Sequence, residues 1–332
     1  MNKSKLFGAA LLLLGAFPTS AALAQSASSK PDTVRIQVYP GAVTLIPVIA
    51  LEKGYCQKYG ITCELVTIPS SVVGLQALLS NGIDVANPAV EAFLQLAGQG
   101  SPVRTIGSTY RGSPYMLVLS GQRKDSSSKS YRDIIHDLKG KKVGVTTLGS
   151  GPYYTLRTFL KDASMSIDDV TPVAVGAPDT AYPAVAHGQV DAAMSFPPMA
   201  AFCDVLKTCR VAFWVRDEGP QVFNAFANSM LPAVVRADYS QKNANAVRKA
   251  FKDAALFLQS KENIDEVHKI QEKYVKFDHP KAKELTHRLL ENILPAQHFD
   301  QADPKELKAA IDYMVSTDQL KKSFDPAGYI AP

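Results

Sequence analysis

The chain has 332 residues, of which 46% are apolar and 20% charged, and its formal net charge is +5 at pH 7. The apolar content excludes a disordered chain. So mild a charge, without a basic run interleaved with aromatic residues, gives no support for nucleic-acid binding. A chain of this length exceeds what one hydrophobic core usually organises, so we expect two lobes.

The N-terminus has the pattern of a secretory signal peptide. Lys3 and Lys5 form a short basic region, an apolar run follows, and Ala22-Leu23-Ala24 fits the small-x-small cleavage pattern. The apolar run is too short to span a bilayer, and no later segment approaches about 18 uninterrupted apolar residues. We therefore expect a cleaved signal peptide at residues 1–24, a disordered linker at residues 25–33 and export to the periplasm.

The four cysteines form two close pairs along the sequence, Cys56 with Cys63 and Cys203 with Cys209. In each pair the first cysteine lies near the end of an expected helix and the second near the start of an expected strand. An even number in an exported protein favours disulfides, and among the possible connectivities we prefer the two local bridges. Free thiols and a metal site are the alternatives. A zinc site has little support, because no histidine lies within a few residues of either pair.

Strand and helix signals alternate from the start of the mature chain. Residues 33–39 (TVRIQVY) alternate in side-chain character, as a half-buried strand does. Strands that alternate with helices of this length are typical of parallel βαβ units. The next expected elements are a helix at 44–59 with Gly60 as its cap, a strand at 62–68, a helix at 72–80, a strand at 84–86 and a helix opened by Asn87-Pro88.

The same series recurs in the second half of the chain. Residues 79–86 (LSNGIDVA) have a counterpart in residues 186–193 (AHGQVDAA), and each stretch closes a helix and opens a strand. Two copies of one αβ unit fit two similar lobes, since a solenoid needs about three or more repeats. We expect strands at 143–147, 170–175 and 191–194, helices at 153–160 and 181–187, and amphipathic C-terminal helices at 242–259, 263–273, 282–294 and 304–316.

Three stretches carry a family pattern: residues 49–54 (IALEKG) with 59–61 (YGI), residues 76–86 with 98–103 (GQGSPV), and residues 137–145 (DLKGKKVGV) with 188–193. In this order they resemble the nitrate/sulfonate/taurine group of ABC-transporter substrate-binding proteins. That group also includes receptors for the pyrimidine precursor of thiamine. In many relatives a Glu-Pro follows the second Asp-Ala strand, but here the residues are Phe196-Pro197-Pro198, so no role of that glutamate is carried over.

The resemblance implies an α/β, two-lobe periplasmic-binding-protein type II fold. Each lobe would be a mostly parallel sheet flanked by helices, with the ligand cleft between the lobes. The chain would cross between the lobes near residues 110–114 and return near residues 217–224. Lobe 1 would then begin at 34–112, lobe 2 would span 113–221, and 222–332 would complete lobe 1 with the C-terminal helices.

Ligands of open α/β sheets bind beyond the carboxyl ends of the strands, and here nearly all those ends lead into a helix start. Free N–H groups and the positive end of the helix dipole allow each helix start to bind an anion weakly. The sharpest is the Gly149-Ser150-Gly151-Pro152 turn, where ligand contact competes with an ordinary N-cap. The candidate ligand-binding residues at such ends are Thr44, Ser70, Ser71, Asn87, Thr147, Gly149, Ser150, Gly151, Asp179 and Thr180.

Arg111 lies at the expected crossing, where its guanidinium could hold two ligand oxygens; the alternative is a surface arginine paired with a carboxylate. Aromatic residues gather on the expected cleft segments, although as many as half of them would be core residues. The aromatic candidates for ligand contact are Tyr110, Tyr153, Phe196 and Trp214.

These observations favour a monomeric binding protein without turnover, which closes on a small anionic organic solute and delivers it to an ABC permease in the inner membrane. The solute would be a sulfonate, a taurine-like compound or an aromatic carboxylate. No cofactor or metal is expected, because no histidine pair has the spacing of a helical metal site. The alternatives are a protein that binds or synthesises the thiamine pyrimidine precursor and a ligand sensor for a membrane receptor.

Overall fold

The computed structural model describes residues 31–40, 44–122 and 130–332. The expected signal peptide and most of the expected linker lie outside the described residues. The first strand, β1 (Asp32–Val38), takes in the last two linker positions, and Val34 and Ile36 on it are fully buried. None of the helices in the described part of the chain has both the length and the apolarity that crossing a membrane requires.

The first elements follow the expected order with one difference. β1 pairs in parallel with β2 (Ile61–Thr67), and α3 (Ser71–Leu79) lies close to its expected range. The helix expected at 44–59 is divided into α1 (Leu45–Glu52) and α2 (Tyr55–Lys58), because Gly54 between them has φ +70°, outside the helical region.

The residues that follow α3 form less regular structure than expected. The strand expected at 84–86 consists only of isolated bridges, from Val85 to Ile36 and from Ala86 to Val234. The helix α4 (Val90–Gly98) begins two residues after Pro88, because Asn87 is held by hydrogen bonds to Gln37 and Ala89 has an extended backbone. The prediction that Pro88 is the first helical residue was therefore wrong.

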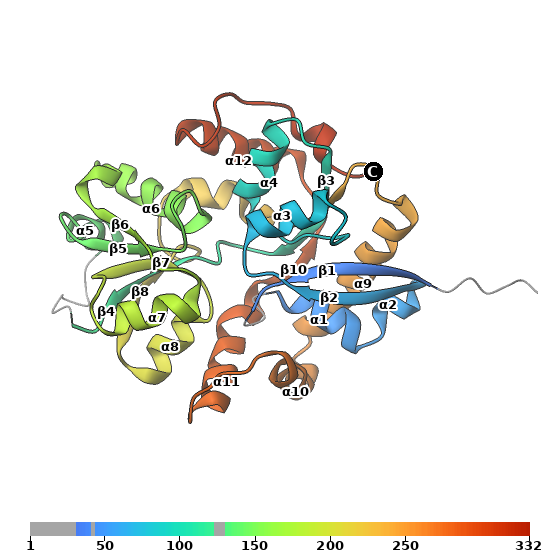
Figure 1. Cartoon of the computed structure of the whole chain (residues 1–332), viewed down its shortest axis with the longest axis horizontal. Helices are drawn as coiled ribbons and strands as arrows, with labels where there is room; N and C mark the ends of the chain where they lie inside the picture. The colour runs from blue at the N-terminus through green and yellow to red at the C-terminus, as the bar shows by residue number, and fades with distance from the viewer. Residues whose placement is uncertain (1–30, 41–43, 123–129) are drawn as a thin grey trace, which may run out of the picture. The chain divides into compact units, whose positions relative to one another are not determined.

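Two further sheets contain the remaining strands of the described residues (Figure 1). β3 (Val103–Tyr110) lies between β9 (Pro232–Arg236) and β10 (Gln297–Asp300) and is antiparallel to both. The five-stranded sheet has the order β6 (Thr171–Ala174), β5 (Lys142–Val145), β7 (Ala192–Ser195), β4 (Met116–Ser120) and β8 (Cys209–Trp214).

The five-stranded sheet is mixed. β5 is parallel to β6 and β7, whereas β4 is antiparallel to β7 and β8. Four strands thus share one direction, and β4, which the chain enters from β3, runs the opposite way. Residues 111–115 lead from the three-stranded sheet into this sheet, and residues 215–231 lead back. Its helices are α5 (Tyr131–His136), α6 (Gly151–Asp162), α7 (Pro178–Ala186) and α8 (Met199–Leu206).

The C-terminal helices agree with the amphipathic pattern to within a residue or two. They are α9 (Gln241–Gln259), α10 (Ile264–Tyr274), α11 (Ala282–Ile293) and α12 (Pro304–Ser316). On α9 the buried residues Val247, Phe251 and Leu258 recur at helical spacing and face the core. α9 packs against α1, α11 against α8, and α12 against the segment 221–229 and α4. These helices therefore cover elements from widely separated parts of the chain.

Both expected local disulfides are present. Cys56 of α2 is bonded to Cys63 of β2, and Cys203 of α8 is bonded to Cys209 of β8. Each bridge thus joins a helix to the strand that follows it, and all four cysteines of the chain are paired.

Replacing both Cys203 and Cys209 with alanine is expected to lower the free energy of unfolding by about 2 kcal/mol, because a bridge that closes so short a loop removes only a modest amount of chain entropy from the unfolded state. Urea unfolding without reductant measures this loss. The reductant should then destabilise the wild type more than the variant. A variant as stable as the wild type, or a non-reduced peptide that links Cys56 to Cys203, would contradict the assignment.

Candidate functional site

A cavity of about 230 Å³ lies where the starts of α3, α4 and α6 meet, and we call it the site cavity. Ser70 and Ser71 line it from α3, Glu91 from α4, and Ser150 from the start of α6. Its other polar or aromatic lining residues are Tyr39, Gln95, Tyr115, Thr146, Thr147, Tyr154 and Phe196.

Two of these helix starts are capped by serine. Ser70 Oγ accepts from the Val73 N–H at 3.5 Å, and Ser150 Oγ accepts from the Tyr153 N–H at 3.4 Å. Each cap satisfies one of the first N–H groups of its helix. At α6 the Ser150 N–H donates to the Thr147 carbonyl and Pro152 has no N–H, so the start of α6 offers fewer N–H donors than that of α3 at the positive end of its dipole. Hydroxyls and helix starts therefore make this end of the cavity suited to oxygen atoms of a ligand.

The buried side chain of Gln37 fixes two of the loops around the cavity. Its Nε2 donates to the carbonyls of Ile68 and Ser70, both at 3.2 Å, and its Oε1 accepts from the Asn87 N–H at 3.1 Å. The side-chain Nδ2 of Asn87 donates in turn to the backbone carbonyl of Gln37, at 2.8 Å. Sequence reasoning missed Gln37 because an alternating strand gives no sign that both of its faces become buried.

Ser71 links the same loops on the cavity wall. Its hydroxyl accepts from the Ala89 N–H at 3.0 Å and shares a hydrogen bond of 2.9 Å with the Tyr39 hydroxyl. Burial raises the pKa of Tyr39 to about 12, so this phenol stays neutral at physiological pH. The starts of α3 and α4 are thus tied to each other and to the end of β1.

Gly151, the first residue of α6, leaves room for the Tyr115 hydroxyl. A Cβ added at Gly151 would lie 2.1 Å from that oxygen and 2.8 Å from the ring carbon that bears it. Tyr115 is only 5% exposed and lines the cavity, so it has little space in which to move away. The glycine therefore serves close packing between α6 and the segment before β4.

We expect Gly151→Ala to destabilise the protein by about 1–3 kcal/mol, because the new methyl group overpacks the cavity wall. Thermal or urea unfolding measures the loss. Adding Tyr115→Phe to the alanine variant should recover part of it, since the closest atom is removed. If the single variant unfolds like the wild type, Tyr115 and Gly151 are not packed in this way.

Seven of the residues predicted to bind ligand line the site cavity. They are Ser70, Ser71, Thr147, Gly149, Ser150, Gly151 and Phe196. They come from α3, from the turn before α6 and from the end of β7, so the structure brings together strand ends that are far apart in the sequence. The Gly-Ser-Gly-Pro turn lies at this cavity.

The other predicted residues lie elsewhere. Thr44, Asn87 and Tyr110 are almost fully buried away from the cavity lining. The ring of Trp214 lies against the guanidinium of Arg216, at 3.9 Å. Tyr153 on α6, Asp179 and Thr180 do not line the site cavity either. The Thr180 hydroxyl donates to the carbonyls of Val175 and Ala177. Asp179 lines a second cavity.

Arg111 also lies outside the lining of the site cavity. Its guanidinium donates to both carboxylate oxygens of Asp300, at 3.0 and 3.1 Å, and its side chain is 47% exposed. The surface ion pair, one of the two interpretations left open by the sequence, is therefore what the structure contains. The anion-binding role expected of Arg111 has no support in this geometry.

Sequence reasoning also missed Glu91. It is 2% exposed and lines the site cavity, and neither carboxyl oxygen has a hydrogen-bond partner among the described residues. Burial raises its pKa to about 7. An acidic residue in the first turn of a helix is common on protein surfaces, so nothing in the sequence pointed to a buried one.

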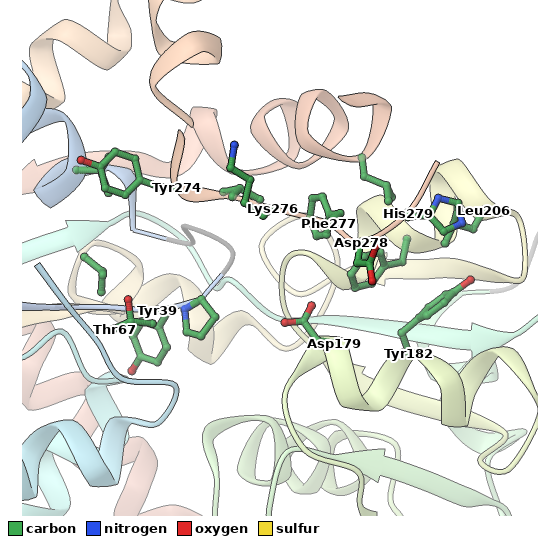
Figure 2. A pocket seen from close by; sticks show the side chains of 16 residues that line it. Tyr39, Thr67, Asp179, Tyr182, Leu206, Tyr274, Lys276, Phe277, Asp278 and His279 are labelled. Carbon is green, nitrogen blue, oxygen red and sulfur yellow. The ribbon is translucent and has the colours of Figure 1, made fainter. Parts of the chain in front are cut away.

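A second cavity, of about 580 Å³, shares Tyr39 with the site cavity. Figure 2 shows Asp179 and Tyr182 of α7 on one side of it and the segment of Lys276, Phe277, Asp278 and His279 on the other. Within the described ranges, no three His, Cys, Asp or Glu side chains are grouped as a metal ion would need. The second cavity has fewer capped helix starts than the site cavity, so we take the latter as the candidate binding site.

Comparison with known proteins gives matches at the level of sequence family and of fold. A family model described as NMT1/THI5 like matches residues 44–255. A Brucella abortus protein that is provisionally named as a binding protein is 30% identical over 156 residues, which are 47% of this chain and 45% of that protein. The chain thus spans about half the length of the curated relatives that it matches.

Two solved structures are similar along nearly the whole chain. The alkanesulfonate-binding protein of Xanthomonas axonopodis pv. citri, bound to MOPS, has a TM-score of 0.70 at 18% identity and covers 91% of this chain and 99% of its own. The periplasmic aliphatic sulphonate binding protein of Escherichia coli has a TM-score of 0.70 at 18% identity, with coverage of 90% and 97%. These likenesses confirm the periplasmic-binding-protein fold that the sequence predicted.

Proposed function

Since this chain belongs to the NMT1/THI5-like family, we propose that it is the periplasmic solute-binding component of an ABC importer, which captures a small organic solute in the site cavity and delivers it to a permease. The observation that carries this proposal is the cavity itself, where three helix starts and a set of hydroxyl and aromatic side chains from distant parts of the chain converge. The relatives named as binding proteins support it as well.

The chemistry of the cavity supports a solute with an oxygen-bearing head and an organic body. The hydroxyls of Ser70 and Ser150 and the helix starts beside them are donors suited to a sulfonate or carboxylate. Tyr115, Tyr154 and Phe196 supply apolar surface for the body of the solute. No lysine, arginine or histidine is among the described residues that line the cavity, so neutral donors would hold the anionic head.

Closure of two lobes on the solute is part of the proposal. The division into 34–112 with 222–332 on one side and 113–221 on the other is supported by the two connections, residues 111–115 and 215–231, that join the three-stranded and five-stranded sheets. The site cavity is lined from both sides of this division, by Ser70 and Glu91 on one and by Ser150 and Phe196 on the other. Binding would favour the closed arrangement that a permease recognises.

A thermal-shift panel of sulfonates, carboxylates and pyrimidines, preceded by native mass spectrometry of the protein as purified, tests this function. A true solute at about 100 times its Kd should add roughly 2.7 kcal/mol to the free energy of unfolding. Ser150→Ala should weaken its binding by about 1 kcal/mol, or roughly fivefold, because one neutral hydrogen bond and one helix cap are lost.

Thr180→Ala is the matched control, since this hydroxyl also lies at a helix start but outside the site cavity. Binding to Thr180→Ala should equal that of the wild type. Equal losses in the two variants would place the solute elsewhere, and a panel in which no compound stabilises the protein would count against this class of solute.

A further inference from the structure

The site cavity contains one carboxyl group that the protein leaves without a partner. Glu91, in the first turn of α4, is 2% exposed, and neither of its oxygens has a hydrogen-bond partner from any other described residue. A buried polar group without a partner costs free energy, and a buried charge costs more. A group brought by the solute would remove that cost.

The described neighbours of Glu91 offer it no cation. The charge of Glu91 acts on two titratable groups, the phenols of Tyr115 and Tyr313. Burial raises the pKa of both phenols. The Tyr313 hydroxyl is bonded to Thr158 at 2.7 Å, and that of Tyr39 to Ser71. With no lysine, arginine or histidine in the described lining, a cationic partner for Glu91 has to come from outside the protein.

The start of α4 alone does not explain this arrangement. A carboxylate in the first helical turn is stabilised by the helix dipole by at most about 2 kcal/mol, and this does not compensate for the loss of its hydration on burial. Here desolvation dominates and raises the pKa of Glu91, and only its own backbone N–H acts in the other direction. The position is therefore costly for the free protein and favourable only when a donor enters the cavity.

We propose that Glu91 binds a nitrogen group, an ammonium or amidine-type N–H, on the same solute whose oxygen-bearing head lies at the starts of α3 and α6. This inference rests on the proposed function and narrows its substrate class to organic acids that also carry a basic nitrogen. Charge complementarity then comes from two ends of one cavity: neutral donors at the helix starts hold the acid group, and one carboxylate holds the nitrogen.

Matched pairs of compounds test the inference by titration calorimetry: 2-aminoethanesulfonate with ethanesulfonate, and 4-(aminomethyl)benzoate with 4-methylbenzoate. At pH 8 the aminated member of at least one pair should bind the wild type about tenfold or more tightly than its partner, as a charge-assisted hydrogen bond in a desolvated site implies. Glu91→Gln should remove this preference. Binding to the wild type should weaken as the pH falls from 8 to 6, because Glu91 takes up a proton, and the variant should lack this dependence.

Asp179→Asn, which neutralises the carboxyl in the second cavity, is the matched control and should bind like the wild type. If both members of a pair bind equally well and Glu91→Gln changes neither, the role of Glu91 is overturned while solute binding stands. If Asp179→Asn removes the preference instead, the nitrogen is bound in the other cavity and the inference is also overturned. If no member of either pair binds, this ligand class fails for the proposed function, and the inference falls with it.

Discussion

The variant Glu91→Gln is expected to be more stable than the wild type by about 3 kcal/mol at pH 8 and to have nearly the same stability at pH 4. The pKa of Glu91 is about 7 in the folded protein, against an ordinary value of 4.5. Between these values the folded chain keeps a proton that the unfolded chain has lost. The free energy of unfolding therefore falls as the pH rises from about 4.5 to 7, by about 1.4 kcal/mol for each pH unit in that range. Glutamine does not titrate, so the free energy of unfolding of the variant lacks this decrease.

Urea unfolding of both proteins between pH 4 and 8 measures the difference, and the comparison cancels the other titrating groups that the two proteins share. Glu64→Gln is a suitable control, because Glu64 is exposed on β2 and its replacement should change the stability by no more than about 0.5 kcal/mol at any pH. Parallel curves for Glu91→Gln and the wild type would show that Glu91 is solvated or paired in solution.

Replacing Gln37 with alanine should lower the free energy of unfolding by about 4 kcal/mol, the largest loss that we expect from a single substitution near the site. The change leaves the Asn87 N–H and the Ile68 carbonyl without partners, and each buried group left unpaired costs about 1–3 kcal/mol. The Ser70 carbonyl loses one of its two hydrogen bonds and keeps the one from the Gly74 N–H. It also opens a cavity, because Gln37 is fully buried. Denaturant unfolding measures the effect.

Solute binding should also weaken in Gln37→Ala, although Gln37 itself does not line the site cavity. Gln37 holds the loops before α3 and α4, so its removal frees the helix starts that face the solute. Gln76→Ala on the exposed face of α3 is the matched control and should stay within about 0.5 kcal/mol of the wild type. A Gln37→Ala protein with wild-type stability would mean that the three hydrogen bonds do not form.

The sequence predicted those parts of the fold that depend on local patterns. The C-terminal helices were found nearly to the residue, because an apolar stripe of helical period is visible without knowing what it packs against. The break at Gly54 and the delayed start of α4 were missed, since the first depends on one backbone angle and the second on the bond between Asn87 and Gln37, 50 residues apart in the sequence.

The same distinction holds at the candidate site. The turn around Ser150 was found because glycine, serine and proline mark a helix start within a few residues. For Arg111 the sequence left ligand contact and a surface ion pair open, because its partner, Asp300, lies 189 positions away and nothing in the sequence connects the two. Glu91 was overlooked for the same reason, because its burial arises from side chains on distant elements.

A crystal structure of the mature protein with the solute that stabilises it most in the thermal-shift panel is the most direct test of the central claim, that the site cavity is where this chain binds its solute. We expect density for the solute between the starts of α3, α4 and α6, with oxygen atoms within hydrogen-bond distance of Ser70 or Ser150 and a nitrogen beside Glu91. Density in the second cavity beside Asp179, or on the outer surface with the site cavity unchanged, would contradict the claim.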